Sequence, residues 1–362
     1  MTLRSVDAIT MDGFKCFDHL RMELGQLTLV TGFNGGGKST AIQPLLLLAQ
    51  TLRLGILTAL PLNGPMVKLG TAGDITPNED GSLTNLTIEG QGTTISVKPK
   101  LRSGDRVLQL VESLSGALDT PLACSLSMLS YLGAIRIGPE DSFPIPEQFD
   151  TPDVGLDGRF APYWYDHHVD EDVDEARRFP GEEASVYRKH LDAWLGSMFP
   201  GAQANVQNVV NLSQMNLQFR LSSLGAWRRP SNIGYGLTYV FPILVSLLSA
   251  KPGQIIIIDS PESHLHPSAQ SQMGRILATF AQAGVQILVE THSDHLLNGV
   301  RLAIREQVLP SDCLRVHFFR GPKGRDHGVT TPSFGAGGEV YEWPDGFFDQ
   351  NEKDLSRLAG WA

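Results

Sequence analysis

The segment 32–39 constrains the fold of this chain most, because its glycine-rich pattern works only between a strand and a helix. It reads G-F-N-G-G-G-K-S and matches G-x-x-x-x-G-K-[ST] in full. Residues 27–30 before it predict a short buried strand, and residues 41–50 after it predict a helix. An α/β fold of the P-loop NTPase type follows from this arrangement.

In such a loop, successive backbone N–H groups and the following helix N-terminus meet the charge of bound phosphate. Lys38 is predicted to reach the β- and γ-phosphates of ATP, and the Ser39 hydroxyl to bind Mg²⁺. The residues predicted to contact the nucleotide here are Gly32, Asn34, Gly35, Gly36, Gly37, Lys38, Ser39 and Thr40.

Two further strands are predicted to end at the same sheet edge. Residues 255–258 are four isoleucines, which favour a strand buried on both faces, and Asp259 follows them. Because ligands bind at the carboxyl ends of parallel strands, Asp259 is the expected second Mg²⁺ residue. Residues 285–289 predict a neighbouring strand that leads to His292, which could contact a γ-phosphate or the attacking water.

A polar turn at residues 231–238 precedes an apolar helical run at 240–250. Gly234, Gly236 and Thr238 would then lie at a second helix N-terminus able to bind an anion. Since Lys38 already serves this chain's own nucleotide, the turn could serve a nucleotide held by a second subunit. A plain helix cap is the alternative that the residues leave open.

Taken together, these segments resemble the ABC-type ATPases, in the branch that contains SMC, RecF and OLD-family heads. Residues 259–267 read D-S-P-E-S-H-L-H-P, residues 290–293 read E-T-H-S, and residues 343–349 read W-P-D-G-F-F-D. Residues 9–17 resemble the opening strand of these heads. The resemblance implies a head that dimerises head to tail around two ATP molecules, each gripped by one subunit's glycine loop and the other's Gly234/Gly236 turn.

Two positions depart from the pattern of that family. Thr238 and Tyr239 stand where its turn ends in Ser-Gln, and Ser260 stands where ABC ATPases place the catalytic glutamate. Serine has no basic group at neutral pH. Relatives in this branch keep a later acid, so Glu262 is the expected general base. Catalysis is therefore assigned to Glu262, His292 and Lys38, with slow hydrolysis or none.

Composition limits the partners. The chain has 362 residues and a net charge of −10, which disfavours a phosphate backbone as ligand, so DNA binding is not supported by charge. The longest apolar stretch, residues 44–62, is interrupted by polar residues and prolines, and a membrane span is not expected. Three widely spaced cysteines fit a reducing cytoplasm without disulfides.

One ATPase head over residues 1–362 is expected, with the nucleotide-binding core at about 1–60 and 200–305. Residues 61–199 would form an inserted lobe, with antiparallel strands at 83–90, 92–101 and 107–114, an irregular stretch at 136–181 and a helix at 182–198. Residues 306–362 would be a family-specific segment, and a hairpin is expected at 205–221. His167 and His168 could bind a metal with Asp170, Glu171 and Asp172, but a mobile acidic loop is preferred.

The resulting expectation is a switch ATPase that controls a separate effector, such as a nuclease or toxin, in anti-phage defence. About 60 residues follow the His292 segment, too few for the Toprim nuclease domain of OLD proteins. The alternatives are a RecF-like ATPase that clamps DNA itself and a hydrolysis-deficient module held together by ATP. A transporter subunit is disfavoured because the L-S-G-G-Q signature is missing.

Overall fold

The computed structural model describes residues 4–76, 85–147, 152–323 and 326–360. Its central sheet has the strand order β16-β15-β3-β14-β13-β9. The pairs β9/β13, β13/β14, β14/β3 and β3/β15 are parallel, and only β16 runs antiparallel to its neighbour. The strands are β3 (Leu27–Gly32), β9 (Ser130–Leu132), β13 (Ile255–Asp259), β14 (Gln286–Glu290), β15 (Leu314–Lys323) and β16 (Asp326–Thr330).

The central sheet is buried on both faces, as the run of isoleucines predicts. Ile256 and Ile258 of β13 pack into one hydrophobic core, while Ile255 and Ile257 pack into the other. Successive side chains of a strand point to opposite faces, so a strand between two cores must be apolar throughout. This double burial fixes the edge of the sheet at which Asp259 emerges.

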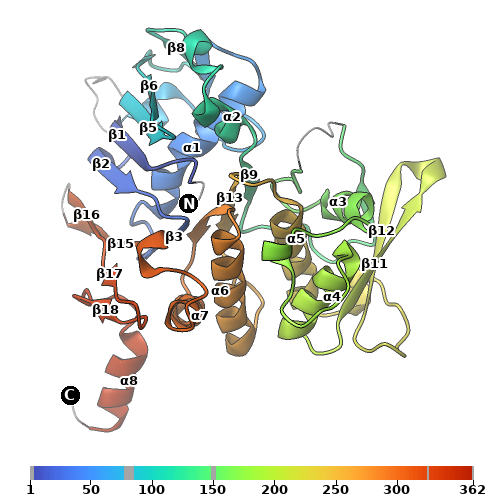
Figure 1. Cartoon of the computed structure of the whole chain (residues 1–362). Helices are drawn as coiled ribbons and strands as arrows, with labels where there is room; N and C mark the ends of the chain where they lie inside the picture. The colour runs from blue at the N-terminus through green and yellow to red at the C-terminus, as the bar shows by residue number, and fades with distance from the viewer. Residues whose placement is uncertain (1–3, 77–84, 148–151, 324–325, 361–362) are drawn as a thin grey trace.

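One face of the sheet is covered by α1 (Lys38–Arg53) and an antiparallel sheet with the order β2-β1-β5-β6. Its strands are β1 (Ala8–Phe14), β2 (Phe17–Glu23), β5 (Asn85–Gly90) and β6 (Thr93–Val97). A small sheet, β4 (Ala59–Pro61), β8 (Val107–Leu110) and β7 (Pro99–Lys100), and helix α2 (Pro121–Ser127) complete this side (Figure 1). The strand expected at 83–90 is β5, although residues 83–84 lie outside the described part. The one expected at 92–101 is divided into β6 and β7, and the one expected at 107–114 ends at Leu110.

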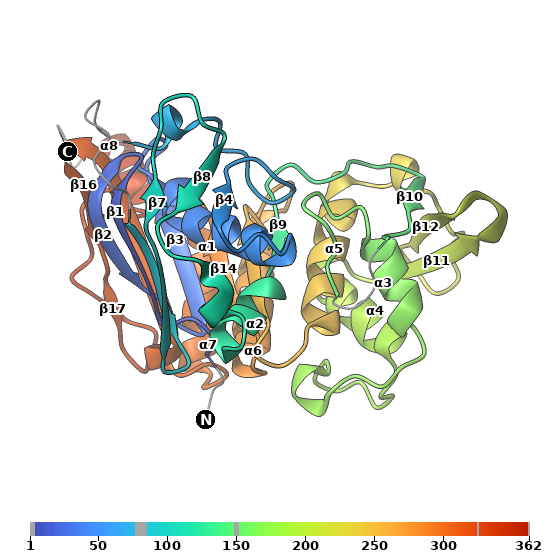
Figure 2. The ribbon, with the colours of Figure 1, turned by 90° about the horizontal axis from the view of Figure 1, so that it is seen from above.

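The other face carries α5, α6 and α7. A lobe that contains α3, α4, β11 and β12 projects on this side, away from the antiparallel sheet (Figures 1 and 2). The helices are α3 (Ala161–His168), α4 (Tyr187–Met198), α5 (Tyr235–Ser249), α6 (Pro267–Gln282) and α7 (Asp294–Arg305). The expected hairpin is β11 (Gln203–Val209) and β12 (Gln214–Arg220), joined by β10 (Ser142–Pro144).

Two local expectations within this lobe were wrong. The stretch 136–181 is not irregular throughout, since it contains α3, which carries Pro162 in its first turn, where the missing N–H costs nothing. The helix expected from residue 182 begins only at Tyr187. Residues before it are extended instead, because the backbone at Ser185 and Val186 pairs with that at Asp172 and Val173.

The chain ends with β17 (Ser333–Phe334), β18 (Val340–Tyr341) and α8 (Gln350–Leu358). The central sheet takes β9 from the segment expected to be an insertion, and β15 from the segment expected to be family-specific. It thus contains strands from outside the two ranges expected to form the core. Within the described residues, no helix is long and apolar enough to cross a membrane.

Candidate functional site

The phosphate-binding loop lies between β3 and α1, as predicted. Gly32 and Gly37 have φ angles of +133° and +97°, which L side chains rarely adopt. A Cβ atom at Gly32 would also meet the backbone of Phe319, and one at Gly37 would meet Phe17 and Cys16. The first turn of α1 carries no acidic residue. The helix N-terminus therefore keeps the positive field that an anion requires.

The side chain of Lys38 folds back over this loop. Its ammonium group donates to the carbonyl oxygens of Gly32 and Phe33 at 3.1 and 2.9 Å. Burial lowers the pKa of Lys38, while Glu290 and Asp259 oppose that shift. Lys38 is thus held at the mouth of the loop, where a cation can meet phosphate oxygens.

The Ser39 hydroxyl meets a carboxylate from the neighbouring strand. Ser39 Oγ lies 3.1 Å from Oε1 and 2.9 Å from Oε2 of Glu290, the last residue of β14. In the parallel pairing of β13 and β14, Glu290 lies directly beside Asp259. The sheet edge therefore presents a hydroxyl and two carboxylates, and sequence reasoning had identified only Ser39 and Asp259.

A cavity of about 320 Å³ opens onto these oxygen atoms. Ser39, Asp259 and Glu290 line it together with Gln43, and the Oε1 atom of Gln43 is buried without a hydrogen-bond partner. Buried polar atoms without a partner are rare, and an absent ion is one of their explanations. Hydroxyl, carboxylate and amide oxygens are the ligands that Mg²⁺ prefers, so this donor set fits the cation that the loop implies.

Burial raises the pKa of Glu290 to about 7, and the nearby Asp259 acts in the same direction. Unfolding returns the group to its ordinary value of 4.5, so the folded chain holds the extra proton between these pH values. The stability contributed by neutral Glu290 is complete below pH 4.5 and is lost as the pH rises through about 7.

Glu290→Gln removes this titration while it keeps the size of the side chain. Without divalent cations, we expect the variant to gain stability over the wild type between pH 5 and pH 8, by on the order of 2–3 kcal/mol. Urea unfolding in EDTA at the two pH values measures the gain. Stability curves that run parallel across this range would contradict the assignment of the raised pKa to Glu290.

Glu262 and His292 are brought together at the same edge. The Glu262 carboxylate accepts hydrogen bonds from the Thr291 hydroxyl at 2.9 Å and from the backbone N–H of His292 at 2.8 Å. The His292 side chain is exposed, and burial of part of its ring lowers its pKa. A neutral imidazole near a phosphate site can accept or donate a proton.

Arg136 holds the turn between Asp259 and Glu262. Its side chain is 2% exposed, and its guanidinium donates to the carbonyl oxygens of Asp259 and Ser260. Burial lowers the pKa of Arg136 to about 10, against the pull of Asp259 and Glu262. Ser260 has a φ angle of +49°, which is uncommon outside glycine, so the buried arginine restrains a strained turn.

Gly234 is the N-terminal cap of α5, and Gly236 and Thr238 lie in its first turn. In the described part of the chain, these residues form no hydrogen bond with the chain's own phosphate-binding loop. The Thr238 hydroxyl donates to the Tyr235 carbonyl within the helix. The helix N-terminus at Gly234 is exposed and open, since nothing lies within 4 Å of the place where its Cβ would be.

Aromatic contacts connect the first turns of α5 to His264, in the segment that follows Asp259. Tyr235 stacks on His264 with centroids 5.4 Å apart, and Tyr239 meets the same imidazole edge to face at 4.6 Å. Arg136 lies over the ring of Tyr239. Tyr239, the departure from the family turn, therefore connects α5 to the residues around Asp259.

The C-terminal motif at 343–349 packs beside the phosphate-binding loop. Phe33 of the loop contacts Phe318, with ring centroids 5.9 Å apart, and its ring lies over Gly346. Phe347 is fully buried against Phe318. The C-terminal motif therefore helps to support the phosphate-binding loop through apolar packing.

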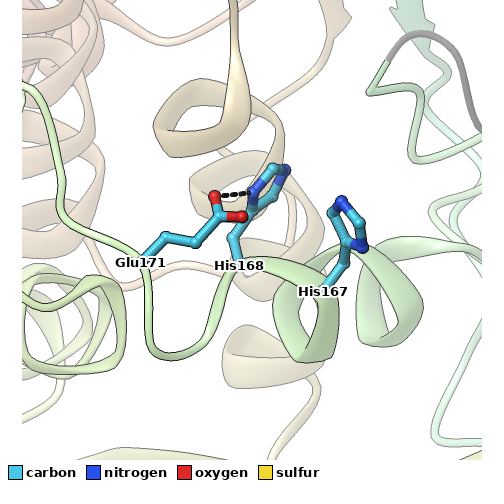
Figure 3. Close-up of side chains that lie close together, drawn as sticks. All are labelled: His167, His168 and Glu171. Atoms are coloured by element: carbon cyan, nitrogen blue, oxygen red, sulfur yellow. Dashed lines mark hydrogen bonds and ion pairs between the residues drawn. The ribbon is translucent and has the colours of Figure 1, made fainter.

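The candidate metal group in the lobe is shown in Figure 3. The ligand atoms of His167, His168 and Glu171 lie within 4.8 Å of one another at the end of α3, so they are closer than their sequence spacing suggested. His168 Nδ1 lies 2.6 Å from Glu171, and its ring packs between Trp164 and Tyr187. An ion pair and ring packing account for this group.

Two protein families match parts of this chain. Residues 149–298 match the family described as "AAA domain, putative AbiEii toxin, Type IV TA system". Residues 309–358 match a second family, described as a protein of unknown function, DUF3696. Over residues 149–298 the chain is similar to that AAA domain. The first match begins beyond the phosphate-binding loop, so that loop is assigned from its own residues.

Solved SMC heads share the fold over nearly the whole chain. The SMC head bound to the C-winged helix domain of ScpA matches with a TM-score of 0.55 and 12% identity, over 91% of this chain and 97% of that chain. The SMC head with an extended coiled coil, bound to the C-terminal domain of ScpA and derived from Pyrococcus furiosus, gives 0.53 and 11%, over 98% and 99%. The chain therefore has the SMC-head fold.

One curated relative is the Old nuclease of Escherichia phage P2, at 38% identity over 60 residues. The match covers 17% of this chain and only about a tenth of the length of that relative. It supports a likeness to the OLD branch in a short segment only.

Sequence reasoning missed Glu290, Arg136 and Thr291 as parts of the site. Glu290 could have been found, because an acid at the end of a buried parallel strand was the reason for choosing Asp259. Arg136 gave no signal, since it follows β9 at a position that only long-range packing brings to the turn after β13.

Proposed function

We propose that this SMC-head-like ATPase is a nucleotide switch. It binds ATP with Mg²⁺, dimerises head to tail around two ATP molecules and hydrolyses them slowly. The observation that carries the proposal is the convergence of Lys38, Ser39, Asp259 and Glu262 at one sheet edge beside a cavity. These groups supply the chemistry that phosphate binding, cation binding and proton removal require, which supports the proposal.

In this proposal, Lys38 binds the β- and γ-phosphates and Ser39 and Asp259 hold the cation. The cation neutralises charge on the phosphates when it is bound. Glu262 orients and deprotonates the attacking water, and His292 contacts the γ-phosphate. Hydrolysis is slow in this proposal because Ser260, which stands in place of the usual catalytic acid, has no basic group.

A separate effector, such as a nuclease or toxin, would receive the signal of the dimer, in the setting of anti-phage defence. The family description with its putative toxin and the short match to the Old nuclease support this part. SMC heads bound to domains of ScpA show that this fold can carry a partner protein.

A second candidate is a module that dimerises on ATP without turnover. Both carboxylate oxygens of Glu262 are already hydrogen-bonded, and Ser260 replaces the usual acid, which together favour it. The two candidates share ATP-dependent dimerisation and differ in phosphate release.

Dimerisation can be tested at Gly234, where a side chain meets open space and the φ angle of −64° suits any residue. We expect Gly234→Asp to stabilise α5 as an N-cap but to repel the γ-phosphate of the partner's ATP. Light scattering with ATP and Mg²⁺ should show a doubling of the 39.5 kDa mass for the wild type and none for the variant.

Gly234→Asn is the matched control, because it has the same shape without the charge. It should dimerise like the wild type. If the aspartate and asparagine variants dimerise equally, the Gly234 turn does not face the partner's phosphate. A wild type that stays monomeric with ATP would remove the head-to-tail dimer.

A further inference from the structure

Glu290 lies beside the hydroxyl that is expected to bind Mg²⁺. Its two carboxylate oxygens lie 3.1 and 2.9 Å from Ser39 Oγ, the hydroxyl expected to bind Mg²⁺. Neighbouring ligands of an octahedral Mg²⁺ shell with bonds of about 2.0–2.1 Å lie about 2.9 Å apart. Ser39 and Glu290 are therefore already spaced as adjacent ligands of one ion.

The position of Glu290 is set by the sheet rather than by a loop. It closes β14, lies between β3 and β13 in the strand order and is paired in register with Asp259. Its side chain is 8% exposed, so the carboxylate has little access to bulk water. A rigid strand end is the kind of support that fixes the geometry of a metal ligand.

The negative charge of Asp259 and Glu290 also favours a bound cation. The carboxyl groups of Asp259 and Glu290 line one cavity together with the Ser39 hydroxyl. The neighbouring cation Lys38 directs its ammonium to the carbonyl oxygens of Gly32 and Phe33. A divalent ion would neutralise both acids at once.

Gln43 supplies an independent observation. It lies in α1, one turn after Ser39, and faces the same cavity. Its Oε1 atom is buried without a hydrogen-bond partner. An amide oxygen left without a donor beside two carboxylates and a hydroxyl has the chemistry of a further cation ligand, directly or through water.

We propose that Glu290 is a ligand of the divalent cation, which makes a site of Ser39, Asp259 and Glu290, with Gln43 at its edge. This inference rests on the proposed function but goes beyond it, because ATPases of this kind need only one acid there. With two carboxylates, of which Glu290 is buried, the site binds the cation before ATP arrives, whereas a single acid would depend on the nucleotide's phosphates.

The test uses Mn²⁺ as the probe, measured by electron paramagnetic resonance on the full chain without nucleotide. The wild type should bind Mn²⁺ and release it when Mg²⁺ is added in excess. Glu290→Gln should weaken Mn²⁺ binding by about tenfold or more, since it removes one charged ligand. Glu290→Asp should retain part of it. Glu306→Gln, an exposed acid paired with Arg275, is the matched control and should bind as the wild type does.

ATP binding is measured separately, in EDTA, with a fluorescent ATP analogue. If the wild type binds the analogue but no Mn²⁺ without nucleotide, the inference about Glu290 is overturned and the proposed function stands. Equal Mn²⁺ affinity in wild type and Glu290→Gln also overturns it. If the analogue binds neither in EDTA nor after Mg²⁺ is added, the proposed function itself fails. Circular dichroism confirms that each variant is folded.

Discussion

Glu262→Gln is expected to lower the rate of ATP hydrolysis by about 10²–10⁴-fold, the usual contribution of a general base. The variant should still fold and bind ATP. The glutamine amide can accept from the backbone N–H of His292 and donate to the Thr291 hydroxyl, so both contacts of the carboxylate have replacements. What the amide lacks is the ability to take a proton from water.

Phosphate release under saturating ATP measures this effect, beside ATP affinity. Glu306→Gln on the surface is the control for a change from acid to amide. Turnover equal to that of the wild type would show that Glu262 positions Thr291 and His292 and is not the base. The search for the base would then move to His292.

Lys38→Ala is expected to weaken ATP binding and to lower kcat/KM by about 10²–10³-fold, as the loss of one preorganised donor to developing charge does elsewhere. The ammonium is held on two loop carbonyls, so it needs little reorganisation to meet phosphate. Removal also leaves the acids Glu290 and Asp259 without their neighbouring cation.

Lys100→Ala, on the exposed side of β7, is the control for loss of one positive charge. Isothermal titration with ATP and phosphate release give affinity and turnover for both variants. If Lys38→Ala binds and hydrolyses ATP as the control does, the segment 32–39 is a glycine-rich turn without a nucleotide.

Much of the central site could be predicted from sequence because it depends on short-range rules. The glycine loop needs a strand before it and a helix after it, and the four isoleucines leave only a strand buried on both faces. Once the strands are parallel, their carboxyl ends must meet at one edge, which places Asp259 and His292 there.

The parts of the fold and of the site that the sequence did not predict depend on contacts between distant segments. β15 joins the sheet beside β3 although nearly 300 residues separate them, and no local pattern marks that pairing. Arg136 reaches the turn after β13 only because β9 pairs with β13. The late start of α4 at Tyr187 likewise follows from pairing with residues 172 and 173.

Arg136 belongs to the segment 61–199 that was expected to form an inserted lobe. Its guanidinium donates a hydrogen bond to the Asp259 carbonyl oxygen and lies over the ring of Tyr239 in α5. One buried side chain therefore joins the sheet edge at Asp259 to α5, the helix that is proposed to face the second ATP. Arg136 therefore provides a direct physical contact between the two places.

The most direct test of the account is release of phosphate from ATP by the purified wild-type chain, with and without Mg²⁺, beside Lys38→Ala. We expect slow release that requires Mg²⁺ and disappears in the variant. Release that persists in Lys38→Ala, or no binding of ATP by the wild type, would contradict the assignment of this sheet edge as an ATP site.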